Sequence, residues 1–226
     1  MTDLELVIIG AGGHGSELQS YVHDVAAAGE RVRLLGFIDE HKPRGASAAA
    51  TILGGVEALR AISRASGGAA LRYITAIGDN AARERCVADV EGLQLGNLAP
   101  WTLRHPRTVV GIGVEVGDGT CLAPGSIVTT RVRLGRHCIV NVKASVSHDS
   151  VIGDFVNLNP GSTICGHVSV GTGCYIGAGA TVLDKVAIGD WTVVGAGAVV
   201  VHDLPPGVTA VGVPARIIKQ SRAPHG

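Results

Sequence analysis

The sequence predicts an α/β domain over residues 1–100, followed by a parallel β-helix over residues 101–226. Two observations predict this division: a strand, glycine turn and helix open the chain, and a strict six-residue period runs from Val110 to Leu204. An amphipathic helix needs apolar residues three and four apart, and a half-buried strand needs one at every second residue. A period of six fits neither pattern and is typical of a parallel β-helix.

Each hexapeptide has a branched aliphatic residue first and, in many steps, a small or β-branched residue fifth. The sixteen first positions follow without an insertion: Val110, Val116, Leu122, Val128, Leu134, Val140, Val146, Ile152, Leu158, Ile164, Val170, Ile176, Val182, Ile188, Val194 and Val200. We expect each hexapeptide to form one side of a triangular prism, with the aliphatic residue inside. Second-position glycines such as Gly111 and Gly117 are expected to allow tight or positive-φ backbone. The repeat alone predicts a scaffold and specifies no reaction.

Composition excludes several classes of function. Lys plus Arg and Asp plus Glu both number 19, so the formal net charge of zero gives no electrostatic reason for nucleic acid or an anionic membrane as partner. The five cysteines are odd in number and lack a C-x-x-C pair, which argues against a disulfide framework; Cys138 and Cys174 are expected to fill the core. Neither a signal peptide nor a membrane-spanning run is recognisable, and we expect a cytoplasmic location.

The first motif is a glycine turn between a strand and a helix. A strand over Leu4–Ile9 leads into Gly10–Gly15, which matches G-x-G-x-x-G, and a helix is expected over Ser16–Ala28. Backbone N–H groups at such a helix start can bind a phosphate. A full dinucleotide fold needs two three-stranded halves and only one Rossmann-like half fits here, so a mononucleotide or nucleotide-sugar site is favoured. A tight turn without a ligand remains the alternative.

Two further strands complete the expected parallel βαβ arrangement. The first, Arg33–Ile38, ends in Asp39-Glu40, where a carboxylate could accept hydrogen bonds from a ribose or base. The second, Leu71–Ile77, precedes a helix over Ala81–Asp89, and Gly45–Ala50 is expected to form a mobile loop.

Single residues around these elements carry narrower expectations. His14 could contact a ligand or cap the first helix. Pro100–Pro106 is expected to mark the domain boundary, with Trp101 and His105 closing the end of the prism and His105 mainly packing.

Titratable residues interrupt the repeat at Ser147-His148-Asp149-Ser150. His148 is third in its hexapeptide, an outward position, and Asp149 follows it at the corner. A neighbouring carboxylate can orient an imidazole and raise its basicity, as a general base near neutral pH requires. The alternative is a solvated histidine without a role. A zinc site shared between β-helix chains, like that of the γ-class carbonic anhydrases, pairs two histidines five residues apart on one chain. No such pair exists here, so no metal is expected.

In this order the motifs are specific, and the sequence resembles the nucleotide-sugar and sialic acid acetyltransferases of the left-handed β-helix superfamily. It is most similar to bacterial 4-aminosugar N-acetyltransferases of the bacillosamine, viosamine or perosamine type. The resemblance is carried by Val7–Gly15, Gly36–Asp39, Ile77–Asn80, His105-Pro106, His148-Asp149, Ile152–Val156, Pro160-Gly161 and Val211–Arg216.

An isolated β-helix exposes flat apolar sides that pairing around a three-fold axis would bury, so we expect a homotrimer. The resemblance implies acetyl-CoA-dependent acetylation of the C4 amine of a nucleotide-linked 4-amino-4,6-dideoxysugar. It implies His148 as general base, supported by Asp149, and direct transfer without a covalent enzyme intermediate. The implied substrate contacts are Gly12, Gly13, His14, Asp39, Glu40, Gly55 and Asn141. The implied acetyl-CoA contacts, in a groove between two subunits, are Asn157, Gly166, Ala178 and Ala196. Pro205–Ile218 resembles the segment that closes the prism.

Three positions depart from the family pattern. Ser147 stands where many relatives have Glu, Asn157 where many have a second histidine, and Ser150 where many have Cys. Asn157 can still donate a hydrogen bond to a thioester carbonyl. The alternatives are a sugar O-acetyltransferase of the sialic acid type, a serine-acetyltransferase-like enzyme, disfavoured by the βαβ domain, and a noncatalytic nucleotide-sugar-binding scaffold.

Overall fold

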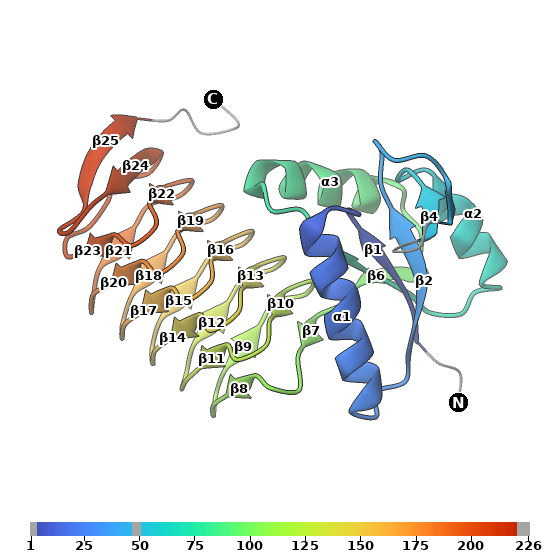
Figure 1. The fold of residues 1–226 in the computed structure, drawn as a ribbon, viewed down its shortest axis with the longest axis horizontal. Helices are drawn as coiled ribbons and strands as arrows, with labels where there is room; N and C mark the ends of the chain where they lie inside the picture. Colours follow the sequence, from blue (N-terminus) through green and yellow to red (C-terminus); the bar gives the residue numbers. More distant parts are fainter. Residues whose placement is uncertain (1–3, 47–50, 221–226) are drawn as a thin grey trace. The chain divides into compact units, whose positions relative to one another are not determined.

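The computed structural model describes residues 4–46 and 51–220 (Figure 1). The chain divides into two compact units, Met1–Pro106 and Arg107–Gly226. Within the described residues, no helix is both long enough and apolar enough to span a lipid bilayer.

The N-terminal unit contains a six-stranded sheet in the order β3-β4-β2-β1-β5-β6. All neighbouring strands are parallel except β3 and β4. The strands are β1 (Leu4–Ile9), β2 (Val32–Ile38), β3 (Gly45–Ala46), β4 (Thr51–Gly54), β5 (Leu71–Thr75) and β6 (Leu98–Pro100). The helices are α1 (Gly13–Ala27), α2 (Ala58–Ala65) and α3 (Asn80–Gly92), and β7 (Leu103–Arg104) ends the unit.

The three strands and two helices expected from the sequence are confirmed; β1 has the predicted ends, and the other four elements have at least one shifted end. Helix α1 begins at Gly13, three residues before its predicted start, because the glycine turn feeds directly into it. Gly15 lies close to the turn: a Cβ there would be 2.2 Å from the carbonyl oxygen of Gly10. Helix α2 was not predicted. Of the expected loop, Gly45–Ala46 pairs with β4, and residues 47–50 lie outside the described residues.

The C-terminal unit is a parallel β-helix, as predicted. Strands 18 residues apart pair in parallel, as Val128 does with Val146 and Val146 with Ile164, so three hexapeptides make one coil. The β10 sheet contains β10 (Cys121–Leu122), β13 (Ile139–Val140), β16 (Asn157–Leu158), β19 (Tyr175–Ile176), β22 (Val193–Val194), β24 (Val208–Val211) and β25 (Arg216–Gln220).

Two further sheets form the other sides of the prism (Figure 1). The β8 sheet contains β8 (Val109–Val110), β11 (Ile127–Val128), β14 (Ser145–Val146), β17 (Thr163–Ile164), β20 (Thr181–Val182) and β23 (Val199–Val200). The β9 sheet contains β9 (Glu115–Val116), β12 (Arg133–Leu134), β15 (Val151–Ile152), β18 (Ser169–Val170) and β21 (Ala187–Ile188). The last strands, β24 and β25, form an antiparallel hairpin that begins in the predicted closing segment and extends past its predicted end, Ile218, to Gln220.

Burial confirms the expected interior of the prism. From Leu122 to Val200 every first-position aliphatic residue is buried, as are the cysteines Cys138 and Cys174 at fifth positions. Each of these cysteine Sγ atoms also donates to a backbone carbonyl, Gly153 O and Gly189 O respectively, at 3.0 Å.

The expectation of positive φ at second-position glycines is wrong. Positive φ occurs instead at the fourth position of the hexapeptide, including non-glycine residues such as Arg131, Asp149 and His167. The second-position glycines are required by coil spacing: a Cβ on Gly111 would lie 2.0 Å from the Thr129 oxygen, and one on Gly117 would lie 2.5 Å from Gly135 backbone atoms.

Candidate active site

The candidate catalytic residues lie at the corner between the β8 and β9 sheets. His148 and Asp149 belong to the turn from β14 to β15, and Asp149 has a φ of 60°, with its N–H donating to the carbonyl of Thr130 at 3.1 Å. Because coils stack every 18 residues, the fourth positions of adjacent coils at this corner lie next to one another. This stacking places Arg131 and His167 on either side of Asp149.

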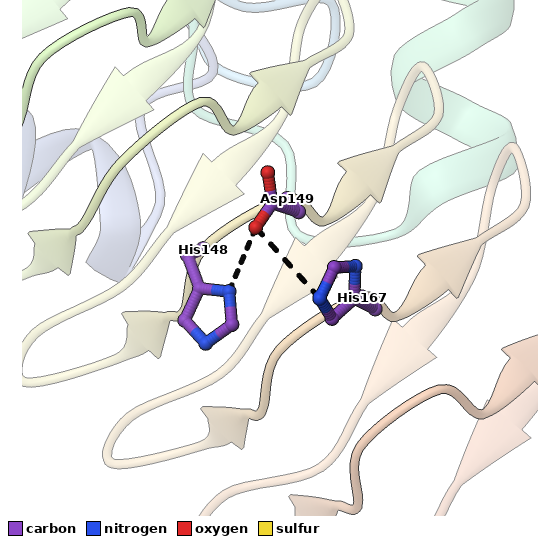
Figure 2. Close-up of side chains that lie close together, drawn as sticks. All are labelled: His148, Asp149 and His167. Carbon is purple, nitrogen blue, oxygen red and sulfur yellow. Dashed lines mark hydrogen bonds and ion pairs between the residues drawn. The ribbon is translucent and has the colours of Figure 1, made fainter.

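Asp149 is the centre of a hydrogen-bonded group (Figure 2). Its Oδ2 lies 2.8 Å from His148 Nδ1, and its Oδ1 accepts from Arg131 Nε at 2.7 Å. Arg131 Nη2 also donates to Oδ2, at 3.0 Å. His167 approaches the same carboxylate less closely, with its Nε2 3.8 Å from Oδ2, and its ring meets the His148 ring edge to face at 5.2 Å.

This geometry fixes the protonation of the carboxylate. The hydrogen bond from Arg131, followed by that from His148, holds the pKa of Asp149 well below its usual value. An ionised Asp149 at Nδ1 favours the tautomer with the proton on Nδ1 and the lone pair on Nε2. His148 is 51% exposed, so its outward position is confirmed and its Nε2 is accessible to a ligand.

Because Gly166 has no side chain, the His148 ring can occupy the space beside it. It lies at the equivalent position one coil further along the same corner, and a Cβ there would be 2.7 Å from Cε1 and 2.8 Å from Nε2 of His148. Its N–H donates to Asp184 Oδ1 at 2.8 Å, which fixes the turn. The structure therefore places Gly166 in contact with the candidate base.

The same corner offers donor atoms of the kind that bind metals. Among the described residues, His148, Asp149 and His167 could each contribute one ligand atom, all within 4.8 Å of one another. Arg131 occupies both carboxylate oxygens of Asp149, however, and a metal ion would face this fixed positive charge. The donor set therefore does not fit a resident metal.

The other residues implied as cofactor or substrate contacts on the prism lie elsewhere. Asn141, Ala178 and Ala196 lie at the corner between the β10 and β8 sheets, one corner away from His148. Ala178 and Ala196 are exposed, and Asn141 Oδ1 accepts from the N–H of Val142 at 2.7 Å. On one chain, the β8 sheet separates these residues from His148.

Asn157 requires a correction. It lies in β16, in the β10 sheet, and is only 3% exposed. It is flanked in the sheet by its register partners Ile139 and Tyr175. This burial opposes the expected hydrogen bond from Asn157 to a thioester carbonyl.

The N-terminal unit brings together the acidic residues at the end of β2 and the glycine turn. Asp39 accepts from the N–H groups of Ala11 and His41, both at 2.9 Å, and of Lys42 at 3.2 Å. Burial alone would raise the pKa of Asp39, but these hydrogen bonds and the Lys42 charge lower it below its usual value. Lys42 Nζ in turn donates to the carbonyl of Ala11.

A cavity of about 270 Å³ lies beside these residues. Its lining includes Gly10, Asp39 and Glu40. Glu40 Oε1 accepts from the N–H of Val56 at 2.6 Å, and a Cβ on Gly55 would lie 2.3 Å from Glu40 Oε2. Gly55 is therefore needed for the Glu40 carboxylate to bind the backbone here.

The glycine turn itself is open. Gly12 and Gly13 are exposed, and a Cβ on either would meet nothing within 4 Å. His14 Nδ1 lies 3.0 Å from Glu17 Oε2. The N-cap position of α1 is Gly12, and no side-chain hydrogen bond caps the start of this helix. His105 is buried, with Nε2 3.0 Å from Asp24 Oδ2, which confirms its packing role.

Sequence reasoning missed Arg131 and His167. The signal that could have found them is the coil period, because both lie 18 residues from Asp149, at fourth positions of the same corner.

Comparison with known proteins gives one consistent result. The PglD N-terminal domain family matches residues 5–90, and the bacterial transferase hexapeptide family (six repeats) matches residues 149–184 and 167–202. A GDP-perosamine N-acetyltransferase of Escherichia coli O157:H7 is 34% identical over 66 residues, a match that covers 29% of this chain and 30% of that protein.

Solved structures match nearly the whole chain. The perosamine N-acetyltransferase of Caulobacter crescentus, solved as a histidine-to-asparagine variant with CoA and GDP-perosamine, is 33% identical, with a TM-score of 0.83. That match covers 96% of this chain and 97% of the other. WeeI of Acinetobacter baumannii is 29% identical with a TM-score of 0.83, covering 95% of this chain and 100% of the other. The chain therefore belongs to the hexapeptide-repeat acyltransferases with a left-handed β-helix, in the family of the perosamine N-acetyltransferases.

Proposed function

We propose that this chain transfers the acetyl group of acetyl-CoA to the C4 amine of a nucleotide-linked 4-amino-4,6-dideoxysugar. The observation that carries the proposal is the exposed imidazole of His148, whose Nδ1 bonds an ionised Asp149 and whose Nε2 can accept a proton. The likeness to a perosamine N-acetyltransferase solved with CoA and GDP-perosamine supports the substrate class.

The proposed reaction needs one base and no covalent enzyme intermediate. His148 Nε2 accepts the proton that the amine nitrogen loses as its lone pair attacks the thioester carbonyl. An amine that arrives as an ammonium ion first releases one proton to solvent. The C–N bond forms, the tetrahedral intermediate collapses, and the C–S bond breaks. The leaving CoA thiolate then takes the proton from His148. Because a neutral amine is already a good nucleophile, proximity of the two substrates supplies much of the rate.

We assign the nucleotide-sugar to the N-terminal unit and the acetyl-CoA to the prism. The nucleotide contacts in this proposal are Gly12, Gly13, His14, Asp39, Glu40 and Gly55, with Asn141 near the reacting groups. The acetyl-CoA contacts are Gly166, Ala178 and Ala196; Asn157 is left out because it is buried. The proposed cellular location is the cytoplasm.

The placement of the candidate base and the proposed acetyl-CoA contacts at two different corners of the prism supports a homotrimer with acetyl-CoA between neighbouring chains. Ala178 and Ala196 share one corner and His148 another, so a groove between two prisms can bring one corner of each chain together. Apolar side chains at the first coils favour such packing, because Val109, Ile112 and Ile127 are 58%, 85% and 42% exposed.

The test measures steady-state CoA release with a panel of 4-amino-4,6-dideoxysugar nucleotides. We expect His148→Asn to lower kcat by about 100-fold, with CoA affinity unchanged in calorimetry. The matched control is His202→Asn, because His202 is an exposed histidine at the equivalent position of the same corner, three coils away. Near-normal turnover of His148→Asn would exclude His148 as the base.

The same assay separates the proposal from its alternatives. Turnover with the 4-hydroxy analogue in place of the amine would indicate O-acetylation instead. Binding of a nucleotide sugar with no turnover on any acceptor would indicate a noncatalytic scaffold.

A further inference from the structure

Arg131 holds the Asp149 carboxylate through two parallel hydrogen bonds. Nε donates to Oδ1 at 2.7 Å and Nη2 donates to Oδ2 at 3.0 Å, a side-on pairing of guanidinium and carboxylate. Two bonds from one planar group restrict rotation of the carboxylate as well as its position. Arg131 is 65% exposed, so this pair adds little to the stability of the fold, and its main effect is on geometry.

The Asp149 carboxylate has two histidines nearby. Its Oδ2 lies 2.8 Å from His148 Nδ1 and 3.8 Å from His167 Nε2. The two rings contact each other edge to face, and both are about half exposed. A small rotation of the carboxylate would therefore exchange one histidine partner for the other.

We propose that Arg131 is a positioning residue that directs Asp149 to His148 and away from His167. The inference rests on the proposed role of His148 as the base. While the guanidinium of Arg131 donates to both carboxylate oxygens, Oδ2 stays hydrogen-bonded to Nδ1 of His148 and the lone pair of that ring stays on Nε2. Without these two hydrogen bonds, the carboxylate is shared between the two rings, and His148 spends part of its time in the unproductive tautomer.

The first test uses Arg131→Gln with a matched control. We expect a loss of kcat of about tenfold with an unchanged KM for acetyl-CoA, because the orientation of the Asp149 carboxylate changes and the contacts with acetyl-CoA do not. Arg131→Lys keeps the positive charge without the two parallel hydrogen bonds, and its kcat should lie between those of the wild type and Arg131→Gln. Arg133→Gln, an exposed arginine two residues away on β12, should keep wild-type kcat.

The second test asks whether the effect passes through Asp149 and His167. In an Asp149→Asn background, Arg131→Gln should lower kcat no further, because the carboxylate that Arg131 orients is already gone. Adding His167→Asn to Arg131→Gln removes the competing ring and should raise kcat by a factor of about three. His167→Asn alone should change kcat by less than about twofold.

A readout without substrate separates this inference from the proposed function. In ¹⁵N-labelled protein, the ring nitrogens of His148 should report a proton mainly on Nδ1, and Arg131→Gln should shift that population toward Nε2. Unchanged nitrogen shifts and unchanged kcat in Arg131→Gln would overturn the inference, and so would an equal loss of kcat in the Asp149→Asn background. Normal turnover of His148→Asn would overturn the assigned base, while the nitrogen shifts would still show whether Arg131 orients Asp149.

Discussion

Replacing Gly166 by alanine should displace the His148 ring with little effect on the fold. The new Cβ would lie 2.7 Å from Cε1, and ordinary contacts begin at 3.4 Å, so that ring atom must move by at least about 0.7 Å. Gly166 does not have a positive φ, so alanine adds no backbone strain. His148 is 51% exposed and can rotate outward, which should keep the loss of unfolding free energy below about 1 kcal/mol.

The catalytic cost should be much larger. A displacement approaching 1 Å in a reacting group can cost up to about 100-fold in rate, so we expect kcat to fall between about 10-fold and 100-fold. The assay is CoA release at saturating substrates, with thermal unfolding measured in parallel. Gly96→Ala is the control, because Gly96 is exposed, lacks a positive φ and has nothing within 4 Å of its Cβ position. Wild-type kcat in Gly166→Ala would refute the placement of the imidazole against Gly166.

Three further predictions concern the scaffold and its assembly. Gly117→Ala should lower the unfolding free energy by about 3 kcal/mol in urea titrations, since its Cβ would meet the backbone of Gly135; an unchanged midpoint would contradict the close coil spacing. Asp39→Asn should lower the free energy of unfolding by about 1 kcal/mol at pH 7, a small loss because the carboxylate is partly solvated. Because the pKa of Asp39 is lowered on folding, its contribution is complete above the unfolded value of about 3.9 and is lost as pH falls through the folded value, so the wild-type advantage should vanish in acid unfolding series. Sedimentation should give a mass near three times 23.0 kDa, and Ile127→Asp should dissociate the assembly; a wild-type monomer would contradict the trimer.

The elements that the sequence predicted are those with strong local signals. The run of apolar residues in β1 ends at a glycine turn, and the structure places both strand ends where predicted. Helix α2 was missed because it is only eight residues long, so its amphipathic pattern, with Leu59 buried and Ile62 partly buried beside it, covers only about two turns. The second-position glycines were identified correctly as special, but their reason is contact between coils, which no single hexapeptide displays.

The candidate site likewise contains contacts that the sequence predicts and contacts that only the stacking of the coils creates. His148 and Asp149 are adjacent in the chain, so their contact follows from sequence order and the outward position of the third residue. Arg131 and His167 reach Asp149 only because coils stack every 18 residues. Burial of Asn157 also depends on its surroundings, which the sequence does not display.

The sequence by itself determined the prism, its buried positions and the histidine–aspartate pair, because a six-residue period of aliphatic residues can bury its apolar side chains only by coiling. The tertiary structure decided which neighbours act on that pair. Arg131 fixes the carboxylate and lowers its pKa, Gly166 makes room for the imidazole, and His167 Nε2 approaches the same carboxylate oxygen to 3.8 Å. These contacts join residues one coil apart, and the physical reason is that hydrogen bonds and steric limits act over distances in space and not along the chain.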